Sequence, residues 1–294
     1  MTMNWQAQGK ELAAWIGGGL CLLMVCLAAT FPYHALQTRV VTEIQRATGL
    51  DVKVTEWSID PPSGLRWQAI TLSKADWTPI HVAELQATIG VWQALSGGLD
   101  VEFALQQDQA STKTGQATGT IVASSLAMDG PVTLKGQLRQ IDLSKLLRQY
   151  VTQGTVSGQF SQRVNSLQVP LDAITGEGTW QAEATDLNVD QIPLGSGRML
   201  SLSFSKVTAG LLCRDRVCTV TQLNGNGNDG SFTGEGTITL QQPIQNSQLS
   251  LSLTVVPGTG FATKAGTLGL PALPPGTSLP FKLVGTLARA RITL

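Results

Sequence analysis

The chain is poor in charge and in the side chains that most enzymes use. Only 14% of its 294 residues are charged, against about 25% in an average soluble domain. The 20 Lys and Arg balance the 20 Asp and Glu, so no excess of positive charge is available for a nucleic-acid backbone, and nucleic-acid binding is not expected. Two His and two Tyr leave few groups for proton transfer or metal binding. The 42% hydrophobic content excludes a disordered chain.

No stretch carries a complete catalytic or cofactor motif. The paired histidines of a zinc hydrolase, the glycine-flanked nucleophilic serine and the phosphate-loop lysine are all missing. Gly225, Gly227 and Gly230 have the spacing of a dinucleotide-binding loop, but an alternating strand follows them, which predicts a tight polar turn. A calcium loop is disfavoured there because Asp229 occupies the position that needs glycine. We therefore expect no cofactor, no metal site and no catalytic residues.

The two histidines are both expected to be structural. His34 lies next to a long apolar stretch, and His81 lies in a predicted strand. An unrecognised hydrolase is the alternative, and it would require His81 in a pocket with a carboxylate partner. The chain is accordingly predicted not to be an enzyme.

A long apolar stretch follows the short N-terminal tail. Residues 12–31 read LAAWIGGGLCLLMVCLAATF and carry no formal charge, and as a helix they would span about 30 Å of hydrocarbon. We predict a retained transmembrane helix; a cleaved signal peptide, with a small-residue site at Ala28 and Ala29, is the competing interpretation. The expected organisation is a cytoplasmic tail and anchor over 1–31, an amphipathic juxtamembrane helix over 32–49, and an exported β-rich domain over 50–294.

The four cysteines form two pairs with different expectations. Cys21 and Cys26 lie inside the apolar stretch, where they are expected to act as small apolar residues. Cys213 and Cys218 would face each other across a hairpin closed by a two-residue turn at Asp215 and the following arginine. We predict a disulfide between Cys213 and Cys218 in an oxidising compartment, with two free thiols as the alternative.

Beyond residue 50 the hydrophobic period changes to two. Apolar and polar residues alternate in many segments, as in Leu249–Val255, and this predicts half-buried antiparallel strands. Two short helices are expected, one over Val91–Leu95 and one over 143–150 behind a capping Asp142. The Gly- and Pro-rich stretch 257–280 predicts a loop that crosses the sheet rather than a pair of strands.

Gly-Thr pairs recur through the predicted strands at irregular spacing, as at Gly119, Gly178 and Gly236. Glycine within strands permits the bends and bulges that a long curved sheet requires. The predicted fold class is therefore mostly β, with one N-terminal transmembrane helix followed by a curved antiparallel sheet and a few short helices. The apolar inner face of such a sheet either packs a core or accepts an apolar ligand, and both alternatives stay open.

The order of these features resembles that of known families. A single span, a helix closing with Thr-Gly, strands, a short helix and a Gly-Gly pair resemble the start of AsmA-like proteins. The Phe-Pro-Tyr exit from the span and the C-terminal strands resemble more closely type II secretion system protein N. The segments that carry the resemblance are 31–72, 81–105, 230–255 and 279–294.

The resemblance implies an elongated, AsmA-like sheet on a single-pass protein of the bacterial inner membrane, with the bulk of the chain in the periplasm. It implies a non-enzymatic accessory component of a type II secretion system that acts through contacts with other components. The AsmA-like character implies an alternative, lipid binding or transfer, with phospholipid in an apolar groove. A continuous lane of Val, Leu, Ile and Phe, left open and neither plugged by side chains nor covered by the helix over 143–150, would favour that alternative.

Overall fold

The computed structural model describes most of the chain beyond residue 50. The described residues are 51–60, 64–74, 77–107, 115–125, 129–146, 151–166, 175–194, 198–241, 246–267, 277–286 and 289–293, together with Thr42. The predicted span, 12–31, lies outside the described residues, and so does the predicted juxtamembrane helix apart from Thr42. Within the described ranges, no helix has the length and apolar character needed to cross a membrane. The chain divides after Leu50 into two units, and the sheet forms the second.

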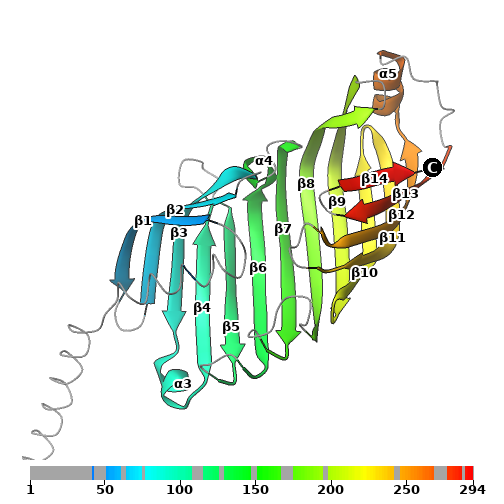
Figure 1. Ribbon diagram of the computed structural model, residues 1–294. Helices are drawn as coiled ribbons and strands as arrows, with labels where there is room; N and C mark the ends of the chain where they lie inside the picture. Colours follow the sequence, from blue (N-terminus) through cyan, green and yellow to red (C-terminus); the bar gives the residue numbers. More distant parts are fainter. Residues whose placement is uncertain are drawn as a thin grey trace, which may run out of the picture. The chain divides into compact units, whose positions relative to one another are not determined.

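The second unit is one antiparallel sheet of fourteen strands in which every strand pairs with its neighbours in sequence (Figure 1). The first seven are β1 (Asp51–Asp60), β2 (Gly64–Lys74), β3 (Trp77–Ile89), β4 (Leu99–Gln106), β5 (Gln116–Ala123), β6 (Val132–Asp142) and β7 (Val151–Val164). The others are β8 (Gly176–Leu194), β9 (Arg198–Arg214), β10 (Val217–Gly227), β11 (Gly230–Thr239), β12 (Gln248–Pro257), β13 (Leu279–Thr286) and β14 (Arg289–Thr293). The predicted mostly-β, antiparallel fold with few helices is confirmed.

Three short helices lie in connections between strands. The predicted helix α3 (Val91–Leu95) joins β3 to β4. The predicted helix α4 (Leu143–Leu146) begins behind its cap: Asp142 Oδ1 accepts hydrogen bonds from the backbone N–H of Ser144 at 2.9 Å and from its hydroxyl at 2.6 Å. The rest of that prediction, 147–150, lies outside the described residues.

The third helix, α5 (Thr259–Thr267), corrects the prediction of a loop over 257–280. It stands between β12 and β13, which pair with each other, so this connection joins neighbouring strands. Contacts distant in sequence hold it: the N–H of Gly258 donates to the carbonyl of Asp229 at 2.9 Å, and that of Gly260 to the carbonyl of Asn228 at 3.0 Å. The local composition of 257–280 does not reveal these distant partners, and its glycines and prolines therefore indicate a loop rather than a helix.

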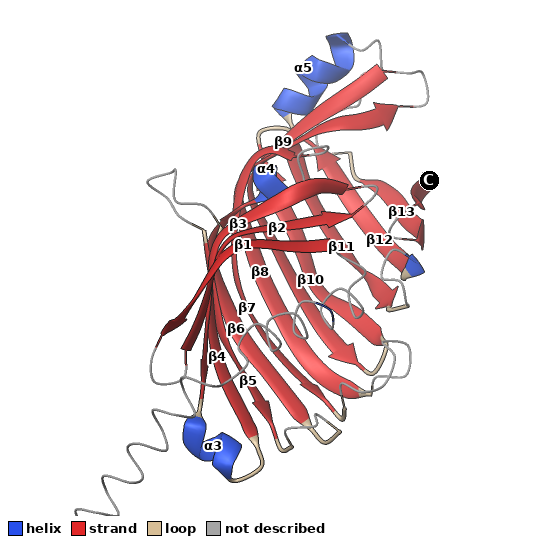
Figure 2. Cartoon of the chain, turned by 60° about the vertical axis from the view of Figure 1, so that its left-hand side comes forward, coloured by secondary structure: helices blue, strands red, loops and turns tan. Residues whose placement is uncertain are grey.

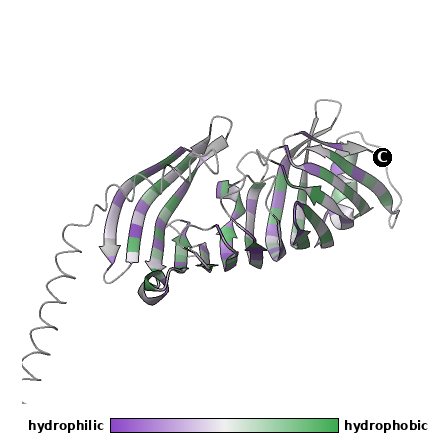
Figure 3. Ribbon diagram, turned by 60° about the horizontal axis from the view of Figure 1, so that its bottom comes forward, coloured by the Kyte–Doolittle hydropathy of each residue, from purple (hydrophilic) through white to green (hydrophobic). Residues whose placement is uncertain are grey.

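Apolar side chains stay on one side of the sheet although several strands bulge. Ala69, Gln140 and Asp186 have φ of 50°, 50° and 51°, and each stands between two apolar residues three positions apart. The flanking pairs are Trp67 and Ile70, Leu138 and Ile141, and Ala184 and Leu187. At Gln140 and Asp186 the pairing shifts by one residue, so an inserted bulge residue accounts for the spacing of three. At Ala69 the pairing with β1 and β3 stays in register, so the left-handed φ turns the strand there without an inserted residue. Apolar and polar bands accordingly alternate along the strands (Figure 3).

The sheet curls, and its two ends, β1–β3 and β13–β14, turn toward the same side (Figures 1 and 2). Its most tightly buried apolar cluster is small: Ala123, Val132 and Val164, packed by Leu99 and Ile121. These residues lie at the end of the strands nearest to α3. Other buried apolar residues are spread over the sheet, from Val52 and Ile70 on β1 and β2 to Leu249 and Leu251 on β12, so burial is not confined to this end.

The left-handed backbone at Ala69 gives a stability test in which replacement by glycine is expected to stabilise the fold. Ala69 is exposed with φ of 50°, where a Cβ is strained and glycine is not, so Ala69→Gly should raise the free energy of unfolding by about 1 kcal/mol. The matched variant Ala87→Gly, at an ordinary strand position, should lower it by about 0.5–1 kcal/mol. Urea titration of both variants measures the change in the free energy of unfolding. Destabilisation by Ala69→Gly would show that the backbone at Ala69 is unstrained.

Candidate functional site

A row of apolar or glycine residues crosses ten strands on one side of the sheet. Each member is the direct cross-strand partner of the next, so the row follows from the pairing register. From β4 to β13 its residues are Phe103, Gly119, Gly136, Phe160, Trp180, Leu211, Val220, Gly236, Leu251 and Leu283. We call this row the apolar lane. With about 4.8 Å between strands, its nine steps extend about 43 Å across the sheet.

Aromatic rings lie over the glycines of the lane and fill the space that side chains would take. A Cβ built on Gly119 would stand 2.7 Å from Phe103 Cζ, and one on Gly136 would stand 2.5 Å from Phe160 Cζ. Phe160 also stacks on Trp180, with ring centroids 4.8 Å apart. The glycines therefore let each ring lie flat against the neighbouring strand, which gives the lane a smooth floor.

The lane is left open by the residues that the structure describes. Phe160 and Leu211 are half-buried and Trp180 is 37% exposed, whereas Val220 and Leu251 are buried. Helix α4 packs against β7 at the far end of β6, behind Asp142, and leaves the lane uncovered (Figure 1). A continuous apolar lane is the feature that would favour the lipid-binding alternative, and over the described residues 143–146 the helix behind Asp142 does not cover it.

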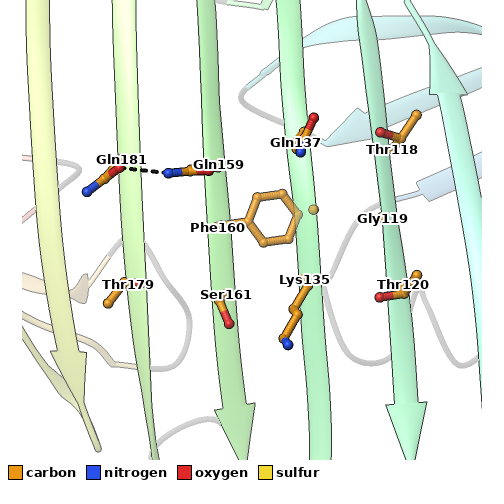
Figure 4. Close-up of a pocket in the computed structure, with 11 residues that line it drawn as sticks. Thr118, Gly119, Thr120, Lys135, Gln137, Gln159, Phe160, Ser161, Thr179 and Gln181 are labelled. Atoms are coloured by element: carbon orange, nitrogen blue, oxygen red, sulfur yellow. Dashed lines mark hydrogen bonds between the residues drawn. The ribbon is translucent and has the colours of Figure 1, made fainter.

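The opposite side of the same strands is polar. Figure 4 shows this polar side. From left to right it shows β8, β7, β6 and β5, which carry Gln181, Gln159, Gln137 and Thr118, whereas Figure 1 shows the same strands in the opposite order, so the two figures view opposite sides of the sheet. The lane therefore faces the viewer of Figure 1, the side toward which the ends of the sheet turn. The lane is on the inside of the curl and the polar side is on the outside.

The polar side holds a shallow cleft of about 690 Å³ over β5–β8. Amide and hydroxyl side chains line it, with Gln159 Nε2 donating to Gln181 Oε1 at 2.8 Å, and Lys135 is the charged group among the lining residues (Figure 4). No carboxylate, histidine or thiol belongs to that lining. In the described ranges no group of three His, Cys, Asp or Glu residues could hold a metal ion.

His81 lies on β3, where its Nδ1 is 3.2 Å from the Thr71 hydroxyl on β2. It is exposed, and none of the ion pairs or side-chain hydrogen bonds found in the described part of the chain joins it to a carboxylate. The hydrolase alternative, which required such a partner, therefore has no support from this residue. His34 lies outside the described residues.

Cys213 and Cys218 are direct partners on β9 and β10 and are joined by a disulfide with an S–S distance of 2.07 Å. The register is the one that the two-residue turn predicts, and Asp215 in that turn has φ of 54°. Both cysteines are 5% exposed and lie in the row beside the lane, next to Leu211 and Val220. The bridge therefore ties together the two strands at the centre of the C-terminal half of the sheet. Cys21 and Cys26 lie outside the described residues.

A charged network lies at the end of the strands opposite to the disulfide. The GNGNDG stretch forms the turn from β10 to β11, as predicted, but the Asp229 side chain in it is fully buried. Its Oδ2 accepts from Lys264 Nζ on α5 at 2.6 Å, and from the backbone N–H and hydroxyl of Ser203 on β9 at 2.5 and 3.0 Å. Lys264 also donates to the carbonyl of Ser201 at 3.0 Å. Sequence reasoning missed this pair, because its partners are 35 residues apart.

The electrostatics of this network favour the ionised carboxylate. Burial raises the pKa of Asp229, but the hydrogen bonds from Lys264 and Ser203 outweigh it, so the pKa lies below its ordinary value. Nearby, hydrogen bonds from Ser201 and Thr152 lower the pKa of Asp190. The hydrogen-bond partners of Asp229 Oδ2 belong to β9 and to α5, so the network holds α5 against the sheet.

The ion pair gives a pH-dependent prediction. The pKa of Asp229 is lower in the folded chain than in the unfolded chain. The stabilisation that its ionised carboxylate gives to the fold is therefore complete above the ordinary pKa of about 3.9, and it is lost as the pH falls through the pKa of the folded state. Lys264→Met should lower the free energy of unfolding at neutral pH by about 2 kcal/mol, since one buried partner remains and Lys264 itself is part-exposed. It should also reduce the loss of stability at acid pH, because only the hydrogen bonds from Ser203 would then oppose the burial that raises the pKa of Asp229.

Lys206→Met is the matched control for Lys264→Met. Lys206 Nζ is 2.8 Å from Glu183 Oε2, but both side chains are about half exposed, so its loss should cost less than about 0.5 kcal/mol. Urea titrations from pH 7 to about pH 3 compare the two variants. Equal effects of both substitutions would contradict the assigned role of the buried pair.

The disulfide gives a second stability prediction. Closing a loop of about five residues in the unfolded chain should stabilise the fold by about 2 kcal/mol, so a reducing agent should lower the urea midpoint accordingly. The double variant Cys213→Ala, Cys218→Ala should start at the lower midpoint and no longer respond to the reductant. An unchanged wild-type midpoint under reduction would show that the bridge adds nothing.

Comparisons of the chain with protein-family models, with curated proteins and with solved structures found no match. The resemblance to type II secretion system protein N and to AsmA-like proteins thus remains an expectation from the residues that carry it. The function is argued from the lane itself.

Proposed function

We propose that the chain binds the acyl chains of a lipid along the apolar lane. The observation that carries this proposal is the lane's composition and exposure: ten consecutive cross-strand positions, all apolar or glycine, lie on the inside of a curled sheet, and all but Val220 and Leu251 are half-buried or exposed. Exposed apolar surface of this extent marks a binding site in most soluble domains. An acyl chain needs apolar contact without hydrogen bonds, and the lane offers that contact.

The dimensions and energetics of the lane fit an acyl chain. Half of a bilayer's hydrocarbon core is about 15 Å, so one extended acyl chain would occupy about a third of the lane's length. Each methylene group moved from water onto an apolar surface contributes about 0.8 kcal/mol. The backbone N–H and C=O groups under the lane pair between strands, so the floor presents few polar groups that an acyl chain would leave unsatisfied.

The setting proposed for this activity is the one expected from the sequence. The apolar stretch 12–31 would anchor the chain in the bacterial inner membrane by a single transmembrane helix, with residues 50–294 in the periplasm. Phospholipids of that membrane would then be the nearest source of acyl chains. The disulfide between Cys213 and Cys218 supports an oxidising compartment. No enzymatic step is proposed.

A second candidate function is an accessory role in a type II secretion system through contacts with its other components. The supporting observation is the sheet's edge: among the described strands, β14 (Arg289–Thr293) pairs on one side only, with β13. A partner strand could add there by backbone hydrogen bonds. Exposed Arg289 and Arg291 would restrict such pairing to a selected partner, since charges on an edge strand discourage indiscriminate addition.

Two adjacent leucines test lipid binding with matched chemistry. Leu211 belongs to the lane, whereas Leu212 points to the polar side and is 48% exposed. In vesicles containing a phospholipid with a photoreactive acyl chain, Leu211→Lys should reduce lipid adducts on the lane by about tenfold, because a charge there must be desolvated. Leu212→Lys should leave the adducts unchanged. Mass spectrometry of the digested full-length chain locates and counts them.

Two controls accompany this comparison. Circular dichroism must show that both variants keep the sheet, and the same crosslinked sample is searched for copurifying proteins. Equal adduct yields in both variants, or adducts confined to the polar side, would reject lipid binding by the lane. Secretion-system components crosslinked in place of lipid would favour the second candidate.

A further inference from the structure

Two large apolar side chains project from the connection between β3 and β4. Trp92 and Leu95 on α3 are 84% and 73% exposed, the two most exposed of the large hydrophobic residues in the described part of the chain. They are three positions apart, which places them on the same face of the helix. Residues 89–98, which we call the α3 tip, read IGVWQALSGG and contain no charged side chain.

The C-terminal part of the α3 tip, which carries Leu95, has its backbone hydrogen bonds satisfied within the tip, whereas no side chain caps the N-terminus of α3. The N–H groups of Ala94, Ser96, Gly97 and Gly98 donate to carbonyl groups of the tip at 3.0–3.2 Å. The Ser96 hydroxyl donates to the carbonyl of Gln93 at 2.8 Å. A segment whose polar groups are already paired can enter an apolar medium at low cost, whereas an ordinary loop cannot.

We propose that the α3 tip inserts into the surface of a lipid bilayer, with Trp92 and Leu95 as the inserted side chains. Trp suits this position because its ring is apolar and its N–H is polar, as the boundary between acyl chains and headgroups requires. The tip extends beyond the ends of the strands at its edge of the sheet (Figure 1). This inference requires no lipid in the lane, so it stands or fails independently of the proposed function.

The size and charge of the tip favour a bilayer over a protein partner. Two such side chains present about 400 Å², whereas a stable protein interface buries about 800 Å² on each partner. The lack of Lys and Arg in the tip also means that attraction to anionic headgroups plays no part. The contact is therefore apolar, and its strength should be insensitive to salt.

Photocrosslinking of the full-length chain tests the inserted position. Trp92 is replaced by p-benzoylphenylalanine, and the protein is reconstituted in vesicles of phosphatidylcholine and phosphatidylglycerol. The control position is Leu212, which is exposed and lies near the same end of the strands, since Cys213 pairs with Gly178 close to the end of β8. We expect at least about tenfold more phospholipid adduct at position 92 than at position 212, with the same ratio in low and high salt.

Three results would overturn the inference. Equal phospholipid adducts at the two positions would show that the tip has no special contact with the bilayer. Adducts at position 92 to a protein would assign the tip to a protein partner instead. Loss of the adducts at high salt would make the contact electrostatic. As a second measurement, Leu95→Ser should reduce the adduct at position 92 by about tenfold, while Leu212→Ser should leave it unchanged.

Discussion

The backbone hydrogen bonds between strands that follow one another in the sequence are the interaction on which the rest of this structure depends. All fourteen strands pair in chain order, so most ladders close over a short connection, the longest exception being the stretch with α5 between β12 and β13. Such local pairing has a low loop-closure cost, and it allows a sheet to form without a second layer to organise it. The consequence is an apolar side that packs mainly against its own neighbours. The small cluster around Val132 at one end supplies the densest packing in the described residues.

In the described residues no second layer covers the apolar side of the sheet, so apolar surface is buried within the sheet itself. The rings of Phe103 and Phe160 lie on glycines of the adjacent strands and so bury surface within the sheet itself. Bulges such as the one at Asp186 add twist and keep the apolar residues on the inside of the curl. The disulfide near one end and the Asp229 ion pair near the other then fasten strands that a core would otherwise hold.

The strands, α3, the cap at Asp142 and the pairing of Cys213 with Cys218 all follow from local rules, and the sequence alone was enough to predict them. Period-two alternation, a two-residue turn and a capping carboxylate act over a few residues. Helix α5 could not be predicted, because its partner Asp229 is distant in sequence and buried by the fold. The apolar lane also needed the structure: Gly119 and Gly136 do not look apolar in sequence, and only the register places them between Phe103 and Phe160.

The exposure of the lane constrains what kind of occupant can complete it. A continuous apolar strip about 43 Å long, with eight of its ten residues half-buried or exposed, is larger than the patches that monomeric domains usually tolerate. A partner that covered it permanently would need side chains complementary to each ring and glycine of the floor. The floor is instead smooth and nearly free of polar groups, so it discriminates little between positions along its length. That property suits an occupant made of repeated, interchangeable methylene groups, which can slide along the lane without breaking any specific contact.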